Sequence, residues 1–174
     1  MSITTQKLEE LRARLLTPDR KGGALLVIYP PEEELLFRAG YAEIRQELQA
    51  NRIEVKPLDL RTQVFELLEK RRKLDLTFQN DANGNGDFYA NLAGMVQRHA
   101  TELVRTAAAQ SPQAILCGLH PAALYPWMSY SSLLEEIEGE VENTLVLPFP
   151  GFEQGQALHF LNAKDGYNYR AARI

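Results

Sequence analysis

The sequence contains a single cysteine, Cys117, among its 174 residues. One thiol excludes an intramolecular disulfide and every zinc site that needs several thiolates. No stretch approaches the roughly 18 to 20 apolar residues of a membrane-spanning helix, and residues 1–10 lack the apolar core of a secretion signal. These absences predict a soluble cytoplasmic protein without a membrane partner, whose fold needs no disulfide.

An excess of positive charge is also missing. The chain has 19 Lys and Arg against 23 Asp and Glu, for a formal net charge of −4. Such a surface repels a phosphate backbone, so we expect no direct binding of nucleic acid. The one concentrated basic run, Lys70 to Lys73, follows a predicted helix, where cations complement the helix dipole, and we interpret it as structural.

Short apolar runs alternate with segments of helical period. The runs predict strands over residues 24–29, 53–58, 114–117 and 144–149, and Pro57 marks the second as an edge strand or a strand end. Apolar side chains spaced by three or four residues predict five helices, with faces Leu8–Leu15, Phe37–Leu48, Leu60–Leu68, Phe88–Leu103 and Tyr130–Val141. We therefore predict one α/β domain over residues 1–174. Its mostly parallel central sheet carries helices on both faces, in a P-loop-like or Rossmann-like topology without a phosphate-binding motif.

Local signals predict where elements begin and end. Asp59 is placed to cap the third helix, and Ser132 with Glu135 fits a capping box. The polar, glycine-rich segment 80–87 predicts a flexible loop. Pro150 and Gly151 predict a turn after the last buried strand, and residues 167–174 are expected to add a hairpin edge.

The carboxyl ends of the strands are the expected ligand site of such a sheet, here segments 29–34, 118–127 and 148–152. A phosphate-binding loop needs glycines after the first strand, but this chain has Pro30 and Pro31 followed by three glutamates. The two prolines lack backbone donors for a phosphate, and the glutamates repel it, so ordinary nucleotide hydrolysis is not expected at this site. We expect no cofactor.

A calcium loop is the one metal site that the sequence raises. Oxygen-bearing side chains alternate from Asp81 through Asn83 and Asn85 to Asp87, with Gly86 sixth, as in the first half of an EF-hand loop. The twelfth position, a bidentate Glu in that loop, is Leu92. A solvated loop is favoured, and calcium binding at Asp81–Asp87 stays an open alternative.

The three histidines are far apart in the sequence. His99 lies on the apolar face of its predicted helix, where a hydrogen-bonded core histidine is the favoured interpretation. His159 alternates with apolar residues and is expected to face solvent. His120 follows a strand's carboxyl end, where a general base could sit, but no nucleophile motif accompanies it. We assign no catalytic residue.

Aromatic side chains gather in two segments. Tyr125, Trp127 and Tyr130 follow the third predicted strand, and Tyr169 precedes Arg170 near the C-terminus. Trp, Tyr and Arg are the residues that most often anchor protein interfaces, although the same side chains also pack cores. We predict these five as partner-binding residues, with core packing as the open alternative.

Several segments together resemble a known family. They are strand 24–29 with its acidic helix, segment 118–134 with Tyr125-Pro126, Pro150-Gly151 after an apolar strand, and the ending Asn168-Tyr169-Arg170-Ala171. Their order and spacing resemble BrxB, a small component of BREX bacteriophage-exclusion systems. The resemblance implies a non-enzymatic role in phage defence, through contact with the alkaline-phosphatase-like component (PglZ) and assembly with a methyltransferase and an ATPase. It brings no catalytic residues.

Two hypotheses follow. The first is a protein–protein interaction subunit, which is expected to form a complex with proteins of the same system. The second is a degenerate nucleotide-binding or hydrolytic domain, motivated by the sheet topology and by His120 at a strand end.

Overall fold

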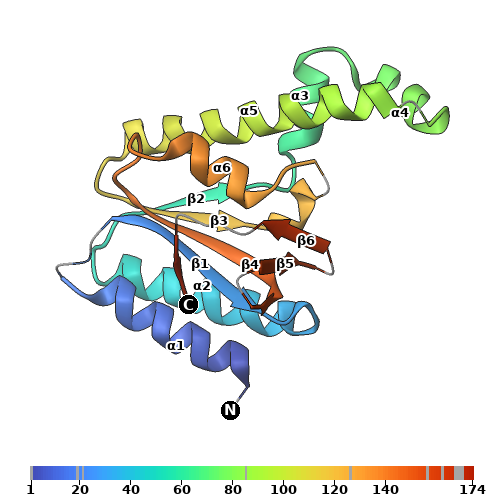
Figure 1. Cartoon of the computed structure of the whole chain (residues 1–174). Coiled ribbons are helices and arrows are strands. Elements are labelled where there is room, and N and C mark those ends of the chain that lie inside the picture. The colour runs from blue at the N-terminus through green and yellow to red at the C-terminus, as the bar shows by residue number, and fades with distance from the viewer. Residues whose placement is uncertain are drawn as a thin grey trace.

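A central β-sheet runs through the computed structural model, with helices on both faces (Figure 1). The structure describes residues 2–18, 20, 22–84, 86–125, 127–155, 157–161, 163–166 and 171–174. The main strands lie in the order β2-β3-β4-β1-β7 and pair in parallel. They are β1 (Gly23–Tyr29), β2 (Val55–Asp59), β3 (Ile115–Leu119), β4 (Thr144–Gln154) and β7 (Ala172–Arg173). The predicted α/β class and mostly parallel sheet are confirmed.

The helices form two layers and a projecting arm (Figure 1). Helices α1 (Ile3–Leu16) and α2 (Glu34–Ala50) cover one face, and α5 (Gly86–Gln110) and α6 (Tyr130–Ile137) cover the other. The short helices α3 (Gln63–Lys70) and α4 (Leu74–Ala82) lie at the N-terminal end of α5, with α4 reaching beyond the sheet. These two helices and that end of α5 form the arm. Single 3-10 turns follow β1 and β3, namely η1 (Pro31–Glu33) and η2 (Pro121–Leu124). Among the described residues, no helix is both long and apolar enough to cross a membrane.

Alternation along the strands divides the core between the two layers. In β1, Leu26 and Ile28 pack with α5 and α6, whereas Val27 and Tyr29 pack with α1 and α2. This is the period of two expected of a strand covered on both faces. A third cluster joins α3 to the first half of α5, through side chains such as Leu67 and Val96.

Strand β4 is longer than predicted. It continues through Pro150 and Gly151 to Gln154, and its second half pairs antiparallel with β5 (Ala157–Phe160), which pairs with β6 (Ala163–Gly166). The predicted turn at Pro150 is therefore wrong. Because Gly23 N donates to Asn143 O, Pro148 and Pro150 turn their missing donors away from β1. On that side β3 pairs with β4 only as far as Val146, so neither proline interrupts that ladder.

Residues 171–174, the described part of the C-terminal segment, lie at an edge of the sheet but do not form a hairpin. Strand β7 lies parallel to β1, with Leu25 opposite Ala172, and Ile174 exchanges backbone hydrogen bonds with Leu26 and Ile28. Residues 167–170 lie outside the described residues. Pro57, by contrast, lies in β2 at the opposite edge of the sheet, as predicted.

Two predicted caps are displaced by one turn or less. Thr62, not Asp59, takes the N-cap position of α3, and the Asp59 carboxylate instead accepts from Arg61 N. Ser129 caps α6, because its backbone is extended and its Oγ accepts from Ser132 N at 3.2 Å. The predicted capping box at Ser132 is therefore wrong.

The predicted loop over residues 80–87 is mostly helical. Helix α4 runs to Ala82 and α5 begins at Gly86, so that only a short turn separates them. The Asn80 amide donates to Leu76 O, and the Tyr89 hydroxyl donates to the Asp81 carboxylate across the two helices. The sequence pattern had predicted that these side chains lie in a solvated loop.

Arg52 adopts a left-handed backbone (φ 61°) directly after α2. Ile53 N donates to Leu48 O and Arg52 N donates to Gln49 O, which is the hydrogen-bonding pattern of a helix end that normally has glycine. We expect Arg52→Gly to raise the free energy of unfolding by about 0.5–1 kcal/mol, because glycine adopts this backbone without steric cost. Urea unfolding measures the change. Arg52→Ala removes the charge but keeps the strain, so an equal gain in that control would contradict the explanation.

Candidate functional site

A cleft of about 370 Å³ lies at the carboxyl ends of β1 and β3, beside the middle of β4. Its walls come from the segments after β1 and β3, from Pro148, and from one face of α2. This volume is within the usual range for small-ligand sites, about 300–1,000 Å³. The sequence therefore predicted the position of the cleft, although it did not predict the contribution of α2.

One side chain of β1 ties the cleft to α2. The Tyr29 hydroxyl donates to Glu34 Oε2 at 2.5 Å, and the Tyr29 ring stacks on Phe37 at a centroid distance of 3.9 Å. Burial, and then the bond to Glu34, raises the pKa of Tyr29 above its ordinary value. Tyr29 is thus a protonated donor that holds Glu34 in place.

Two arginines of α2 line the cleft, and sequence reasoning missed both. Arg38 and Arg45 make no ion pair among the described residues. The Arg45 guanidinium lies 5.4 Å from the Tyr41 ring centroid. Arg45 Nε is buried and has no hydrogen-bond partner among the described residues, and the buried Tyr41 hydroxyl lies beside the Cys117 thiol. The helical spacing of Glu34, Arg38, Tyr41 and Arg45 was the available signal, because it places them on one face.

His120 enters the cleft from the end of β3. Its backbone is left-handed (φ 56°), and its carbonyl accepts from Ala123 N at 3.1 Å. Burial, followed by the nearby Arg61 charge, lowers the pKa of His120 from its ordinary value. The ring is therefore mostly neutral at pH 7. The described residues that line the cleft include no Ser, Thr or Cys that could act as a nucleophile beside His120.

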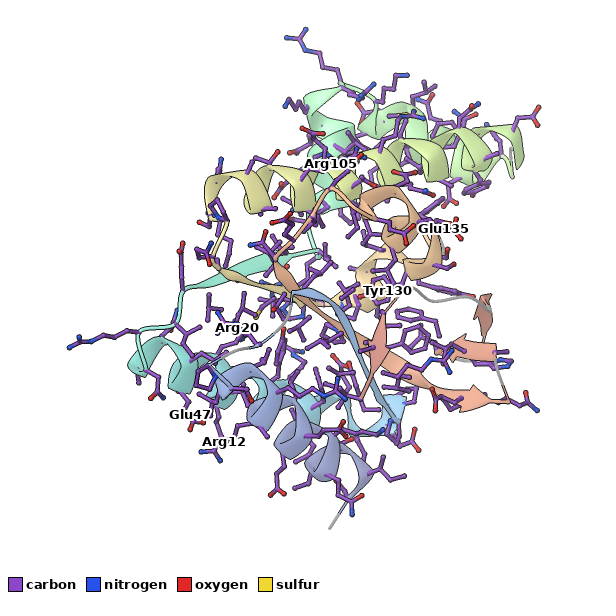
Figure 2. The ribbon with its side chains drawn as sticks, turned by 60° about the vertical axis from the view of Figure 1, so that its left-hand side comes forward. Arg12, Arg20, Glu47, Arg105, Tyr130 and Glu135 are labelled. Carbon is purple, nitrogen blue, oxygen red and sulfur yellow. The ribbon has the colours of Figure 1, made fainter. Side chains whose placement is uncertain are left out.

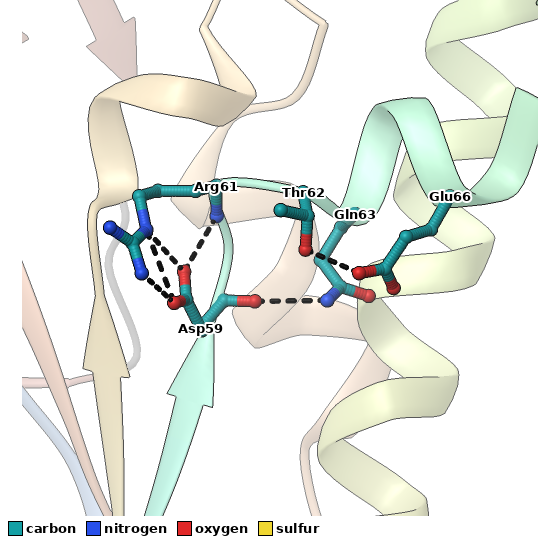
Figure 3. A network of polar contacts seen from close by, with 5 residues as sticks. All are labelled: Asp59, Arg61, Thr62, Gln63 and Glu66. Atoms are coloured by element: carbon teal, nitrogen blue, oxygen red, sulfur yellow. Dashed lines mark hydrogen bonds and ion pairs between the residues drawn. The ribbon is translucent and has the colours of Figure 1, made fainter.

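Asp59 and Arg61 form a polar network at the end of β2 (Figure 3). Arg61 Nη2 donates to Asp59 Oδ2 at 2.6 Å, and the bond to Arg61 is the main cause of a lowered Asp59 pKa. Gln63 Nε2 donates to Asp59 O at 2.9 Å, and Gln63 Oε1 lies 3.0 Å from His99 Nε2. His99 is hydrogen-bonded, as the sequence predicted, but it is half-buried and not in the core. The network joins the edge strand to α5.

The five predicted partner-binding residues lie in different environments. Tyr125 is 42% exposed, with its ring 6.1 Å from Phe160. Trp127 is half-buried and stacks on Tyr89 at 5.7 Å. Tyr130, labelled in Figure 2, is on the inward face of α6 and is only 4% exposed. Its ring packs in the core against Phe149 and Phe160. In this fold Tyr130 packs the core and is not available to a partner. Tyr169 and Arg170 lie outside the described residues.

The calcium interpretation finds no support in the arrangement of Asp81 and Asp87. They lie on different helices, α4 and α5, whereas an EF-hand loop needs its ligands on one continuous loop. The Asp81 carboxylate accepts from Tyr89. No group of three or more His, Cys, Asp or Glu side chains is placed to hold a metal within the described ranges.

Cys117 lies in β3, fully buried beside Tyr41. Burial raises the pKa of its thiol from 9.0 to about 11, which leaves about 100-fold less thiolate at a given pH. We expect alkylation by iodoacetamide at pH 8 to be at least 100-fold slower in the native protein than in urea, as followed by mass spectrometry. Equal rates in the two conditions would contradict the burial of this thiol.

Comparison with known proteins bears on the resemblance seen in the sequence. A family model described as "BREX protein BrxB" matches residues 56–174, from β2 to the last residue. No curated protein and no solved structure matches the chain. The matched region contains η2, α6, the long strand β4 and the α3–α5 arm. Since the match spans more than half of the chain, the protein belongs to the BrxB family and is a component of a BREX phage-defence system.

Proposed function

We propose that this chain is a non-enzymatic interaction subunit of its BREX system and that it binds the PglZ-like component. Membership of the family supports a place among BREX proteins. The observation that carries the proposal is the exposure of large apolar side chains. They are Ile3, Leu35, Leu36, Phe65, Leu76, Phe78, Tyr125 and Phe152. Exposed apolar side chains that form a contiguous patch commonly mark a surface that a partner covers.

Most of these side chains fall into two regions. Leu35, Leu36, Tyr125 and Phe152 lie in segments that follow β1 and β3 or extend β4. Phe65, Leu76 and Phe78 lie on α3 and α4. Tyr125 and Trp127 follow η2, where Tyr125 packs on Phe160 of β5 and Trp127 packs on Tyr89 of α5. These two aromatics are the proposed anchors.

Co-expression with the PglZ-like protein of the same system tests the proposal. We expect a stable complex, and we expect Tyr125→Ala and Trp127→Ala each to weaken it by about 2 kcal/mol, or about 30-fold in Kd. Ile3→Ala is the matched control. It removes an exposed apolar side chain from α1, outside both regions. Absence of a complex would refute the proposal. Lowered stability with unchanged affinity would make Trp127 a packing residue only.

A second candidate function is the binding of a small anion in the cleft at the carboxyl ends. The favouring observation is the pair Arg38 and Arg45, which line the cleft without an ion-pair partner among the described residues. Pro30 and Pro31 remove backbone donors from the segment before α2, and Glu34 adds negative charge to the cleft, so a triphosphate is disfavoured relative to a smaller anion. Isothermal titration with ATP, GTP, cyclic nucleotides and inorganic phosphate tests this candidate. No heat with any of them would remove it.

A further inference from the structure

We propose that a groove formed by α3, α4 and α5 binds an acidic amphipathic helix of the partner protein. This inference rests on the function proposed above, because it names the surface and the chemistry of the contact. The groove has a volume of about 360 Å³. We call it the arm groove.

The floor of the arm groove is apolar and is built from all three helices. Leu68 of α3 and Leu92 of α5 form its buried part, at 3% and 2% exposure. Phe88 and Met95 of α5 are half-buried, and Leu76 of α4 is 50% exposed. The floor is therefore continuous with the core of the arm but open to solvent along α4.

The sequence produces this opening through the turn after α3. Arg72 adopts a left-handed backbone (φ 53°), and Lys73 N donates to Leu68 O, which ends the helix and turns the chain outward. Helix α4 then runs beyond the sheet (Figure 1) and has no buried residue. Tyr89 holds it to α5 through the Asp81 carboxylate. The helix is thus fixed in place, with Leu74 packed against the cluster of α3 and α5, but Leu76 and Phe78 are exposed.

The rim of the arm groove is basic. Arg71, Lys73 and Arg98 line it, and no carboxylate is among its lining residues. Among the described residues these three cations form no ion pair, whereas Arg12, Arg14, Arg61, Arg105 and Arg173 each have a carboxylate partner. In a chain of net charge −4, this is a local concentration of unpaired positive charge. Helix-end capping explains the position of the basic run but not Arg98, which comes from α5.

Apolar floor and basic rim together indicate the occupant. An amphipathic helix places anchors at i, i+3 or i+4, and i+7 into an apolar groove, and acidic residues flanking that stripe would meet the three cations. Nucleic acid would use the cations but would leave Leu76 and Phe88 without a role. A second copy of this chain is a further occupant that the test must distinguish.

Site-specific photo-cross-linking in the purified complex with the PglZ-like protein tests the inference. A benzoylphenylalanine replaces Leu76, and in a matched control it replaces Ile3 on α1, which is also exposed. We expect cross-links from position 76, mapped by mass spectrometry, to a helical segment of the partner with acidic residues beside its apolar stripe. We expect none to that segment from position 3. Cross-links to a basic or extended segment, to a second copy of this chain, or to nothing would overturn the inference.

Charge reversal supplies the second measurement. Arg71 and Arg98 are exposed, so the double variant Arg71→Glu/Arg98→Glu is expected to keep the wild-type melting temperature but to raise the Kd at least 10-fold. Its Kd should also depend less on salt. Lys7→Glu/Arg52→Glu makes the same change in net charge away from the groove and should leave the Kd unchanged.

The outcomes separate the two proposals. If the wild-type chain forms no complex, the proposed function and the arm groove both fail. If the complex forms but the groove variants bind normally, only the arm groove fails. Labelled duplex DNA is added as a competitor, and DNA binding that the double variant abolishes and the PglZ-like protein displaces would make the arm groove a nucleic-acid site and overturn the inference.

Discussion

Replacing Phe149 by Ala is expected to lower the free energy of unfolding by about 3–5 kcal/mol. Phe149 is fully buried in β4, with its ring centroid 5.1 Å from Phe160 and 6.1 Å from Tyr130. The loss combines the burial energy of the ring with the cavity left between the sheet and α6. Urea unfolding monitored by circular dichroism measures it.

Phe152→Ala is the matched control for this prediction. Phe152 lies three residues further along the same strand but is 45% exposed, so its loss should cost no more than about 0.5 kcal/mol. Since domains of this size have a total stability of about 5–15 kcal/mol, Phe149→Ala should also reduce the amount of folded protein in cells. Similar unfolding curves for the two variants would contradict the assignment of Phe149 to the core.

Gly151→Ala is expected to destabilise the protein by about 3 kcal/mol or more, at the upper end for overpacking. A Cβ at position 151 would lie 1.9 Å from His159 O and 2.9 Å from the Phe149 ring. The nearer atom belongs to the backbone of β5, so the clash cannot be relieved by a side-chain rotation. Pairing between β4 and β5 must open.

Hydrogen exchange localises this effect. Amides of β5 should lose protection in Gly151→Ala, whereas those of β1 should lose much less. The control is Gly94→Ala in α5, where the nearest atom to an added Cβ is Arg98 Nη1 at 3.6 Å and alanine favours the helix. That variant should be as stable as the wild type or more so. Unchanged protection of β5 in Gly151→Ala would contradict the close approach of these strands.

The sequence predicted those elements whose burial follows their own periodicity. Phe37, Tyr41, Ile44 and Leu48 recur at helical spacing, and all four are buried on the inward face of α2. The apolar run before Tyr29 predicted a strand covered on both faces for the same reason. In each case the pattern reports a contact with the sheet, so the pattern and the structure agree.

The sequence failed where the deciding contact is not periodic. Helix α4 has no fully buried residue, so its sequence shows no apolar face. Asn80 and Asp81, whose side-chain hydrogen bonds hold the helix, are residue types typical of loops. The sequence predicted that strand β4 ends before Pro150. Only the pairing partners show that the backbone nitrogens of its prolines, which cannot donate, point away from β1.

The candidate site shows the same division. The strand ends that line the cleft could be predicted from topology. Helical spacing places Arg38 and Arg45 on one face of α2, but only the structure shows that this face lines the cleft, because an arginine on a helix is usually solvated. Tyr130 was predicted as a partner anchor from its residue type, but the rotation of α6 directs it inward.

Strand β1 has a consequence for how the chain could be divided. It lies between β4 and β7, yet it precedes residue 56, where the match to the BrxB family begins. A fragment of residues 56–174 would therefore lack the strand between β4 and β7. An extended segment with apolar side chains in the places of Leu26 and Val27 could pair there and fill both core layers. Residues 1–55 naturally supply that strand, and the two fragments form a pair suited to reconstitution in trans, with recovery of phage resistance as a reporter of assembly.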